Sequence, residues 1–321
     1  MEPLIASTVL IPTKPAFEQI AIHRIQLRLT TANVSGANND QGVCVQMNAA
    51  DENFYLHRGM DNFENRHTDT YDVLSRHINF IKDIQFIKLG VKGSDNWRMQ
   101  KLELLLNDCA FPVFVKDFGV NGTNITLDQP LTIASQVLRQ AAGWNYNNNN
   151  TQIHLLPAIL PKAKLLSLME AAIGNQIQHT SNLEWGNYSG IDTRWGPVVE
   201  VSYKNANTLT FDLDLQKQVD GPNPEVDINF DLEFKCINGH IRFEVKNVTY
   251  DTSWWAKILE WLKEMVPILL TKSLGNPLAG IGAGYLSKFL DYSVAFTPDA
   301  PPTQQACRLI LVQPNCDIRL R

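Results

Sequence analysis

Residues 61–73, DNFENRHTDTYDV, and residues 91–97, VKGSDNW, flank a hydrophobic run and decide the fold of the first part of the chain. The first piece joins an aromatic–acid turn at Phe63-Glu64 to an extended segment, Thr68 to Tyr71. The second is a polar loop that ends at Trp97. Extended segments that alternate with polar, glycine-containing turns are typical of antiparallel β-structure.

The segments around this stretch repeat the same pattern. In residues 22–30, Ile25, Leu27 and Leu29 share one face, as expected of a half-buried strand. Short strands at intervals of roughly ten residues, with turn residues between them, favour a β-sandwich over a βαβ fold. We expect this domain to span residues 1–120. The other predicted strands of this domain are VCVQM (43–47), FYLHR (54–58), TDTYDVL (68–74), IQFIKLGV (84–91) and MQKLELLL (99–106).

These features together resemble the PLAT/LH2 family, a β-sandwich module found beside lipases and lipoxygenases and in membrane-associated proteins. The resemblance covers residues 22–118. It rests on the turn at 36–40, the apolar alternation at 43–47, Leu56, Phe63, residues 68–71, the apolar run that ends at Leu89, Gly93 and Trp97. It implies docking to a membrane or to a protein surface. The sequence departs from the family at 39–42, where Asn-Asp-Gln-Gly replaces the usual Gly-Thr-Asp-Ala.

The resemblance also suggests a calcium site. Asp40, Asp61 and Asp95 lie in loops that the family fold would bring to one end of the sandwich. Carboxylate oxygens from separate loops suit calcium, and such an ion can bridge to lipid headgroups. The alternative is ordinary turn chemistry, because Asp stabilises turns in many loops. The departure at 39–42 weakens the calcium interpretation, and we expect no other cofactor.

Residues 121–321 form a second expected domain, an α+β unit. Helices are predicted at 131–142 and 161–178, and strands at 198–203, 208–216, 225–237 and 240–250. Apolar and polar residues alternate from Glu225 to Phe234, which indicates an antiparallel sheet with one solvated face. Asn238-Gly239 predicts a tight hairpin turn after it.

Two amphipathic helices are predicted after this sheet, at 254–274 and 278–290. Trp254 and Trp255 are adjacent, so on a helix they point about 100° apart and both are buried only if the helix is enclosed. Trp97, Trp254, Trp255 and Trp261 are therefore candidates for ligand or membrane contact, with core packing as the alternative. A curved sheet followed by apolar helices faintly resembles the TULIP lipid-binding superfamily, which implies an apolar ligand.

Catalysis finds little support in the sequence. Neither Gly-x-Ser-x-Gly nor His-Glu-x-x-His occurs, so the enzyme interpretation is weak, although a hydrolase with an unrecognised site stays open. The formal net charge of −5 and the dispersed bases argue against a nucleic-acid partner. We expect no signal peptide and no transmembrane helix, hence a soluble protein that is cytoplasmic or released by a non-classical route.

The sequence thus predicts a mainly β, two-domain, non-enzymatic lipid- or membrane-associating protein. Its PLAT-like domain would dock to a membrane or protein surface, and its C-terminal domain would bind an apolar ligand. The alternative is a toxin component or structural subunit that uses residues 254–290 for oligomer or membrane contact. A homo- or hetero-oligomer is compatible with both functions.

Overall fold

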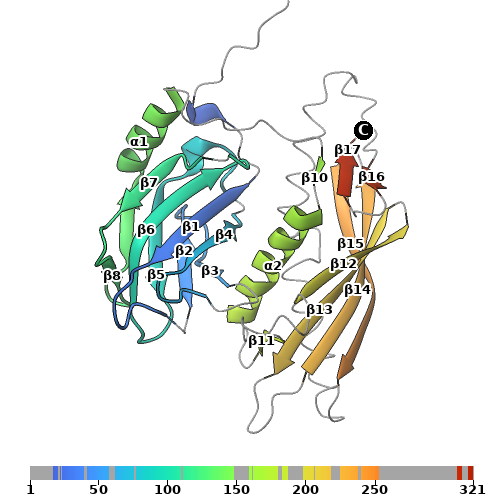
Figure 1. Cartoon of the computed structure of the whole chain (residues 1–321). Helices are drawn as coiled ribbons and strands as arrows, with labels where there is room; N and C mark the ends of the chain where they lie inside the picture. Colours follow the sequence, from blue (N-terminus) through green and yellow to red (C-terminus); the bar gives the residue numbers. More distant parts are fainter. Residues whose placement is uncertain are drawn as a thin grey trace, which may run out of the picture.

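The computed structural model (Figure 1) consists mainly of β-strands. Two predicted calcium ligands, Asp40 and Asp61, lie outside the described residues, and so do residues 253–308 with the predicted tryptophan helices. The structure describes residues 17–20, 22, 24–39, 42–57, 62–75, 77–109, 111–147, 159–160, 162–179, 183–186, 198–205, 207–217, 225–237, 240–252, 309–312 and 317–320.

Two antiparallel sheets form the predicted β-sandwich. One has the order β4 (Thr68–Val73), β1 (Ile25–Thr31), β6 (Trp97–Leu106), β7 (Phe114–Asp117), with β8 (Thr123–Ile125) also paired to β6. The other has the order β3 (Phe54–Leu56), β2 (Val43–Gln46), β5 (Phe86–Val91), β9 (Leu131–Ala134). Short 3-10 turns, η1 (Phe17–Gln19) and η2 (Ile81–Asp83), contact each other beside them.

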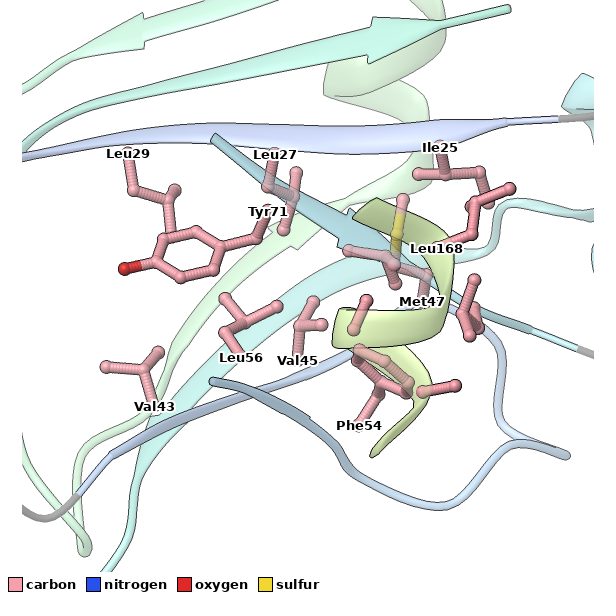
Figure 2. Close-up of a cluster of buried hydrophobic side chains, with 14 of the residues drawn as sticks. Ile25, Leu27, Leu29, Val43, Val45, Met47, Phe54, Leu56, Tyr71 and Leu168 are labelled. Carbon is pink, nitrogen blue, oxygen red and sulfur yellow. The ribbon is translucent and has the colours of Figure 1, made fainter. Parts of the chain in front are cut away.

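The strand alternation seen in the sequence fills the space between the sheets. Every second residue of β1, from Ile25 to Thr31, is buried, and Val43 and Val45 face them from β2 (Figure 2). The segments at 62–73 and 91–97 contribute an aromatic cluster to this core. Phe63 stacks on Tyr71 with ring centroids 5.0 Å apart and meets Trp97 edge-on at 5.2 Å.

The sandwich extends beyond the expected boundary at residue 120. β8 pairs with the start of β6, and β9 pairs with β5 from Leu131↔Leu89 to Ala134↔Phe86. The helix predicted at 131–142 therefore begins four residues late, as α1 (Ser135–Asn147). The first residues, LTIA, instead complete a sheet edge, because Ile133 is buried against the core whereas Thr132 and Ala134 are exposed.

A helix covers each open side of the sandwich (Figure 1). α1 contacts β5, β7 and β9 on one side. On the other side α2 (Lys162–His179) contacts β3 and β4, the edge strands of the two sheets, and it matches the predicted helix at 161–178. In Figure 2 the side chain of Leu168 lies among Ile25, Met47 and Phe54. A helix over such an edge protects unpaired backbone groups from other strands.

The C-terminal part contains the predicted second antiparallel sheet. Its order is β11 (Leu183–Trp185), β13 (Thr208–Lys217), β14 (Glu225–Ile237), β15 (His240–Thr252), with β12 (Val199–Asn205) also paired to β13. Val226, Ile228, Phe230 and Leu232 are buried, which confirms the predicted apolar face, and Ile237↔His240 closes the predicted hairpin. β10 (Ile159–Leu160), β17 (Asp317–Leu320) and β16 (Leu309–Val312) form a smaller sheet.

α2 connects the two parts of the molecule. It contacts β3 and β4 of the sandwich and also β11 and β12 of the second sheet, and Figure 1 shows it between them. Such a helix is buried nearly all round, and Leu165, Leu168, Met169 and Ile173 are each at most 2% exposed. Among the described residues, no helix is both long and apolar enough to cross a membrane.

Candidate functional site

One end of the sandwich gathers four loops. The strand pairings Thr30↔Thr68, Val43↔Val91 and Trp97↔Ile125 bring together the loops at 32–42, 57–67, 92–96 and 126–130. We call this the loop end. The loop at 107–113, which follows Leu106, lies at the opposite end of the sandwich.

Asp95 is the one predicted calcium ligand that the structure describes. It lies at the loop end, and its carboxylate accepts a hydrogen bond from the backbone N–H of Asn96 at 2.8 Å. This contact is the turn chemistry that competes with the calcium interpretation. Within the described residues, no group of three or more His, Cys, Asp or Glu side chains is placed to hold a metal ion. The calcium site stays a prediction.

Trp97 packs in the core. Its side chain is 0% exposed, and the indole Nε1–H donates a hydrogen bond to Thr31 Oγ1 at 3.0 Å. A buried indole needs such a partner, because its N–H otherwise loses its hydrogen bond to water. In this structure Trp97 is therefore not available for ligand or membrane contact. Trp254, Trp255 and Trp261, the other predicted contact residues, lie outside the described residues.

Exposed apolar side chains stand at both ends of β8. Val120, in the turn before this strand, is 74% exposed, and Leu127, at the loop end, is 60% exposed. Single exposed apolar residues are common on proteins, and the three residues of β8 separate the two turns that carry these side chains. Phe111 is similarly exposed (62%) but lies at the opposite end of the sandwich. These residues could not be predicted from the sequence, because exposure in a turn carries no periodic signal.

A partly buried ionic network joins α2 to the sandwich. Arg24 donates two hydrogen bonds to Asp72, at 2.6 and 2.9 Å, and one to Asp108 at 2.7 Å. From α2, Lys164 forms an ion pair with Asp108, and the hydroxyl of Ser167 donates to Asp72 at 2.5 Å. We call Arg24, Asp72, Asp108, Lys164 and Ser167 the α2 network. Its two cations and two carboxylates balance in charge.

The electrostatics of the α2 network favour a structural role. Burial lowers the pKa of Lys164, although the carboxylate of Asp108 opposes this shift. Burial also acts against the charge of Arg24, but Asp72 and Asp108 outweigh it and raise the pKa of Arg24. Because each carboxylate contacts a cation, neither is available as a free base for catalysis. The network could not be predicted from the sequence, because Arg24 is 48 and 84 residues away from its partners Asp72 and Asp108.

A small cavity of about 10 Å³ adjoins this network, with room for about one water molecule. Its wall includes polar groups from His57, Tyr71, Asp72, Ser167 and Glu170, and is completed by Phe54, Thr70 and Ala171. Burial, together with the nearby charge of Lys92, lowers the pKa of His57 to about 4. His57 is therefore neutral at physiological pH. The size of the cavity suits a bound water and excludes a lipid chain.

The polar face of the second sheet carries carboxylates in direct opposition. Glu200 pairs with Asp212, and Asp214 pairs with Asp227. Burial raises the pKa of Asp214 to about 6, with further contributions from the charges of Asp227 and Asp212 and a hydrogen bond to Asp227. Directly opposed like charges destabilise a sheet. Repulsion between these opposed carboxylates therefore destabilises this part of the sheet at neutral pH.

The chain has weak structural similarity to known proteins. No protein-family model and no curated protein sequence matches the chain. Solved structures similar to it include the alpha-toxin of Clostridium absonum, with 16% identity over 38% of this chain and 33% of the toxin, at a TM-score of 0.32. The alpha-toxin of an avian Clostridium perfringens strain is 19% identical over 38% of this chain and 33% of the toxin, at a TM-score of 0.28. Coral 8R-lipoxygenase, in which a C2-like domain mediates calcium activation, is 15% identical over 35% of this chain and 16% of the lipoxygenase, at a TM-score of 0.28.

The chain thus spans a third or less of the length of these proteins. Identities below 20% and TM-scores of 0.28 to 0.32 establish neither a family nor an activity for it. The fold is established as a β-sandwich with a second antiparallel sheet by the strand pairings themselves. The TULIP resemblance receives no support from these matches.

Proposed function

We propose that the chain is a non-enzymatic protein that associates with lipid membranes. Its PLAT-like sandwich docks through two exposed apolar side chains, Val120 and Leu127, in the turns before and after β8. The exposure of these two side chains is the observation that carries the proposal. We further propose that the C-terminal part binds an apolar ligand against the apolar face of its second sheet, whose described side chains are buried in this structure.

The physical basis is the transfer of apolar side chains out of water. Fully burying a Val or Leu side chain contributes about 1.5–3 kcal/mol. Two partly exposed side chains on neighbouring turns therefore supply a modest, reversible attraction to the bilayer interface. Net charge does not assist, because the formal charge is −5 and an anionic membrane repels it.

Calcium provides a route around this repulsion. Asp95 lies at the loop end with Leu127, and the loops that contain Asp40 and Asp61 begin and end there. Under this proposal, an ion held by these three carboxylates bridges the protein to anionic headgroups. Membrane binding should then require calcium on anionic vesicles, and should be less dependent on it on zwitterionic vesicles.

The proposal is tested by co-sedimentation of the full chain with vesicles of phosphatidylcholine alone and of phosphatidylcholine mixed with phosphatidylserine, with and without calcium. Leu127→Asp should reduce binding at least about tenfold, because it removes apolar area and adds a charge that is costly to bury. Phe111→Asp is the matched control, since Phe111 is equally exposed at the opposite end. If wild type fails to bind all compositions, or if both variants lose binding equally, the docking surface is wrong.

A further inference from the structure

The two sides of α2 differ in chemistry. Its sandwich side is polar: Lys164 and Ser167 contact the sandwich carboxylates, and Asn175 Oδ1 accepts a hydrogen bond from the backbone N–H of Tyr55 at 2.8 Å. Near the end of the helix, Lys92 Nζ donates to the backbone carbonyl of Gln178 at 2.6 Å. Leu168 and Ala171 add a smaller apolar contribution on this side.

The opposite side of α2 is mainly apolar; by helical position Lys162 and Gln176 also lie there, between apolar residues. At 100° per residue, the apolar residues lie away from Lys164, Leu168 and Asn175 and on the side where α2 contacts β11 and β12. Each is at most 2% exposed, and they belong to one hydrophobic cluster that includes the buried side chains of β12 and β13 and also those of the sandwich core. The members of this apolar side are Leu165, Met169, Ile173 and Ile177.

The contact of α2 with the sandwich and its contact with the second sheet respond differently to separation in water. Ions, hydroxyls and amides that lose their partners regain hydrogen bonds from water, so opening a polar contact costs little on balance. Opening an apolar contact returns hydrocarbon surface to water with no such compensation. The small cavity at the sandwich contact further reduces the apolar contact there.

We infer that α2 is a latch that stays with the second sheet and releases from the sandwich, so that the two parts of the molecule separate at the α2 network. Release uncovers the open side of the sandwich between β3 and β4, including the N–H of Tyr55. It also returns Arg24, Asp72 and Asp108 to water. In the closed state α2 blocks this edge against any other chain.

The key variant is Lys164→Met, which keeps the length of the side chain and removes its charge, in the full-length protein. The readout is hydrogen exchange of the Tyr55 amide, compared with amides of the sandwich core (Leu27) and of the second sheet (Phe211). We expect Tyr55 to exchange at least about tenfold faster in the variant, while the other two amides keep their protection. Lys88→Met, an exposed lysine on β5, is the matched control and should leave all three amides unchanged.

Three results would overturn the latch. The first is Tyr55 exchanging together with Leu27 in the wild type, which means that the edge opens only with the whole sandwich. The second is an unchanged Tyr55 rate in Lys164→Met. The third is equal acceleration of Phe211, which means that α2 leaves the second sheet as well. If Lys164→Met does not fold, Ser167→Ala, which removes one hydrogen bond to Asp72, carries the same test with the same criteria.

Discussion

The side-chain carbonyl of Asn175 on α2 accepts a hydrogen bond from the backbone N–H of Tyr55 on β3 at 2.8 Å. Tyr55 belongs to a sheet edge, where a strand normally exposes unpaired backbone groups. Asn175 is 3% exposed, so this bond replaces the missing neighbouring strand in a largely dry environment. A helix side chain thus completes the hydrogen bonding of a sheet.

Asn175→Ala should therefore lower the free energy of unfolding by about 1–3 kcal/mol, because the Tyr55 N–H loses its acceptor in a buried position. Urea denaturation measures the loss. Asn96→Ala, at an exposed loop position, is the control and should change stability by less than about 0.5 kcal/mol. A variant as stable as the wild type would mean that water replaces the amide and that the edge is wetter than it appears in the structure.

Gly174, one residue earlier, sets how closely α2 approaches the sandwich. A methyl group at this position would overlap with the backbone carbonyl oxygen of His57. Gly174→Ala should consequently destabilise the protein, even though alanine is favoured over glycine within a helix by about 1 kcal/mol. Thermal unfolding of this variant beside Ala171→Gly separates the two effects. If contact geometry dominates, both substitutions lower the melting temperature; a rise for Gly174→Ala would show that helix propensity outweighs the contact.

Elements that bury one face were predictable, and contacts between distant segments were not. The alternation from Glu225 to Phe234 predicted β14, and the apolar spacing in 161–178 predicted α2, because both patterns are local. The segment LTIA at 131–134 was predicted as the start of a helix, and this prediction was wrong. Four residues are too few to distinguish helical from strand periodicity, and only the pairing with β5 shows that they form a strand. The α2 network is invisible in sequence, since its charged residues resemble any solvated residues until the fold brings them together.

The hydrogen bond between Trp97 and Thr31 tests how the aromatic cluster is held. Thr31→Val keeps the shape of the side chain but removes the acceptor of the buried indole N–H. We expect a loss of about 1–3 kcal/mol in the free energy of unfolding. Trp97→Phe should cost more, because it also leaves a cavity beside Phe63. In the double variant the two losses should not add, since the second substitution no longer breaks the bond. Additive losses would show that Thr31 acts by packing alone.

Two aspartates on the polar face of the second sheet should respond to pH in opposite directions. Asp214 lies opposite Asp227, and its pKa in the folded protein is raised to about 6 by burial and by neighbouring carboxylates, from an ordinary value of 3.8. Asp231, on β14, accepts hydrogen bonds from Thr210 at 2.7 Å and from Asn247 at 2.5 Å, and pairs with Lys204 at 2.5 Å. Burial opposes its ionisation, but these partners outweigh burial and lower the pKa of Asp231.

The signs follow from proton linkage. Between pH 4 and 6 the folded state holds the proton of Asp214 while the unfolded state releases it, so the stability due to Asp214 falls as pH rises through this window. Asp214→Asn should remove this fall and raise stability at pH 7 relative to wild type. The charged Asp231 stabilises the fold above its ordinary pKa, so Asp231→Asn should lower stability at pH 7, and this difference should vanish in acid below the lowered pKa of Asp231. Denaturant titrations of the three proteins from pH 8 down into the acid range below the ordinary aspartate pKa of 3.8 measure both effects. Equal destabilisation by the two substitutions at pH 7 would mean that the opposed carboxylates do not repel.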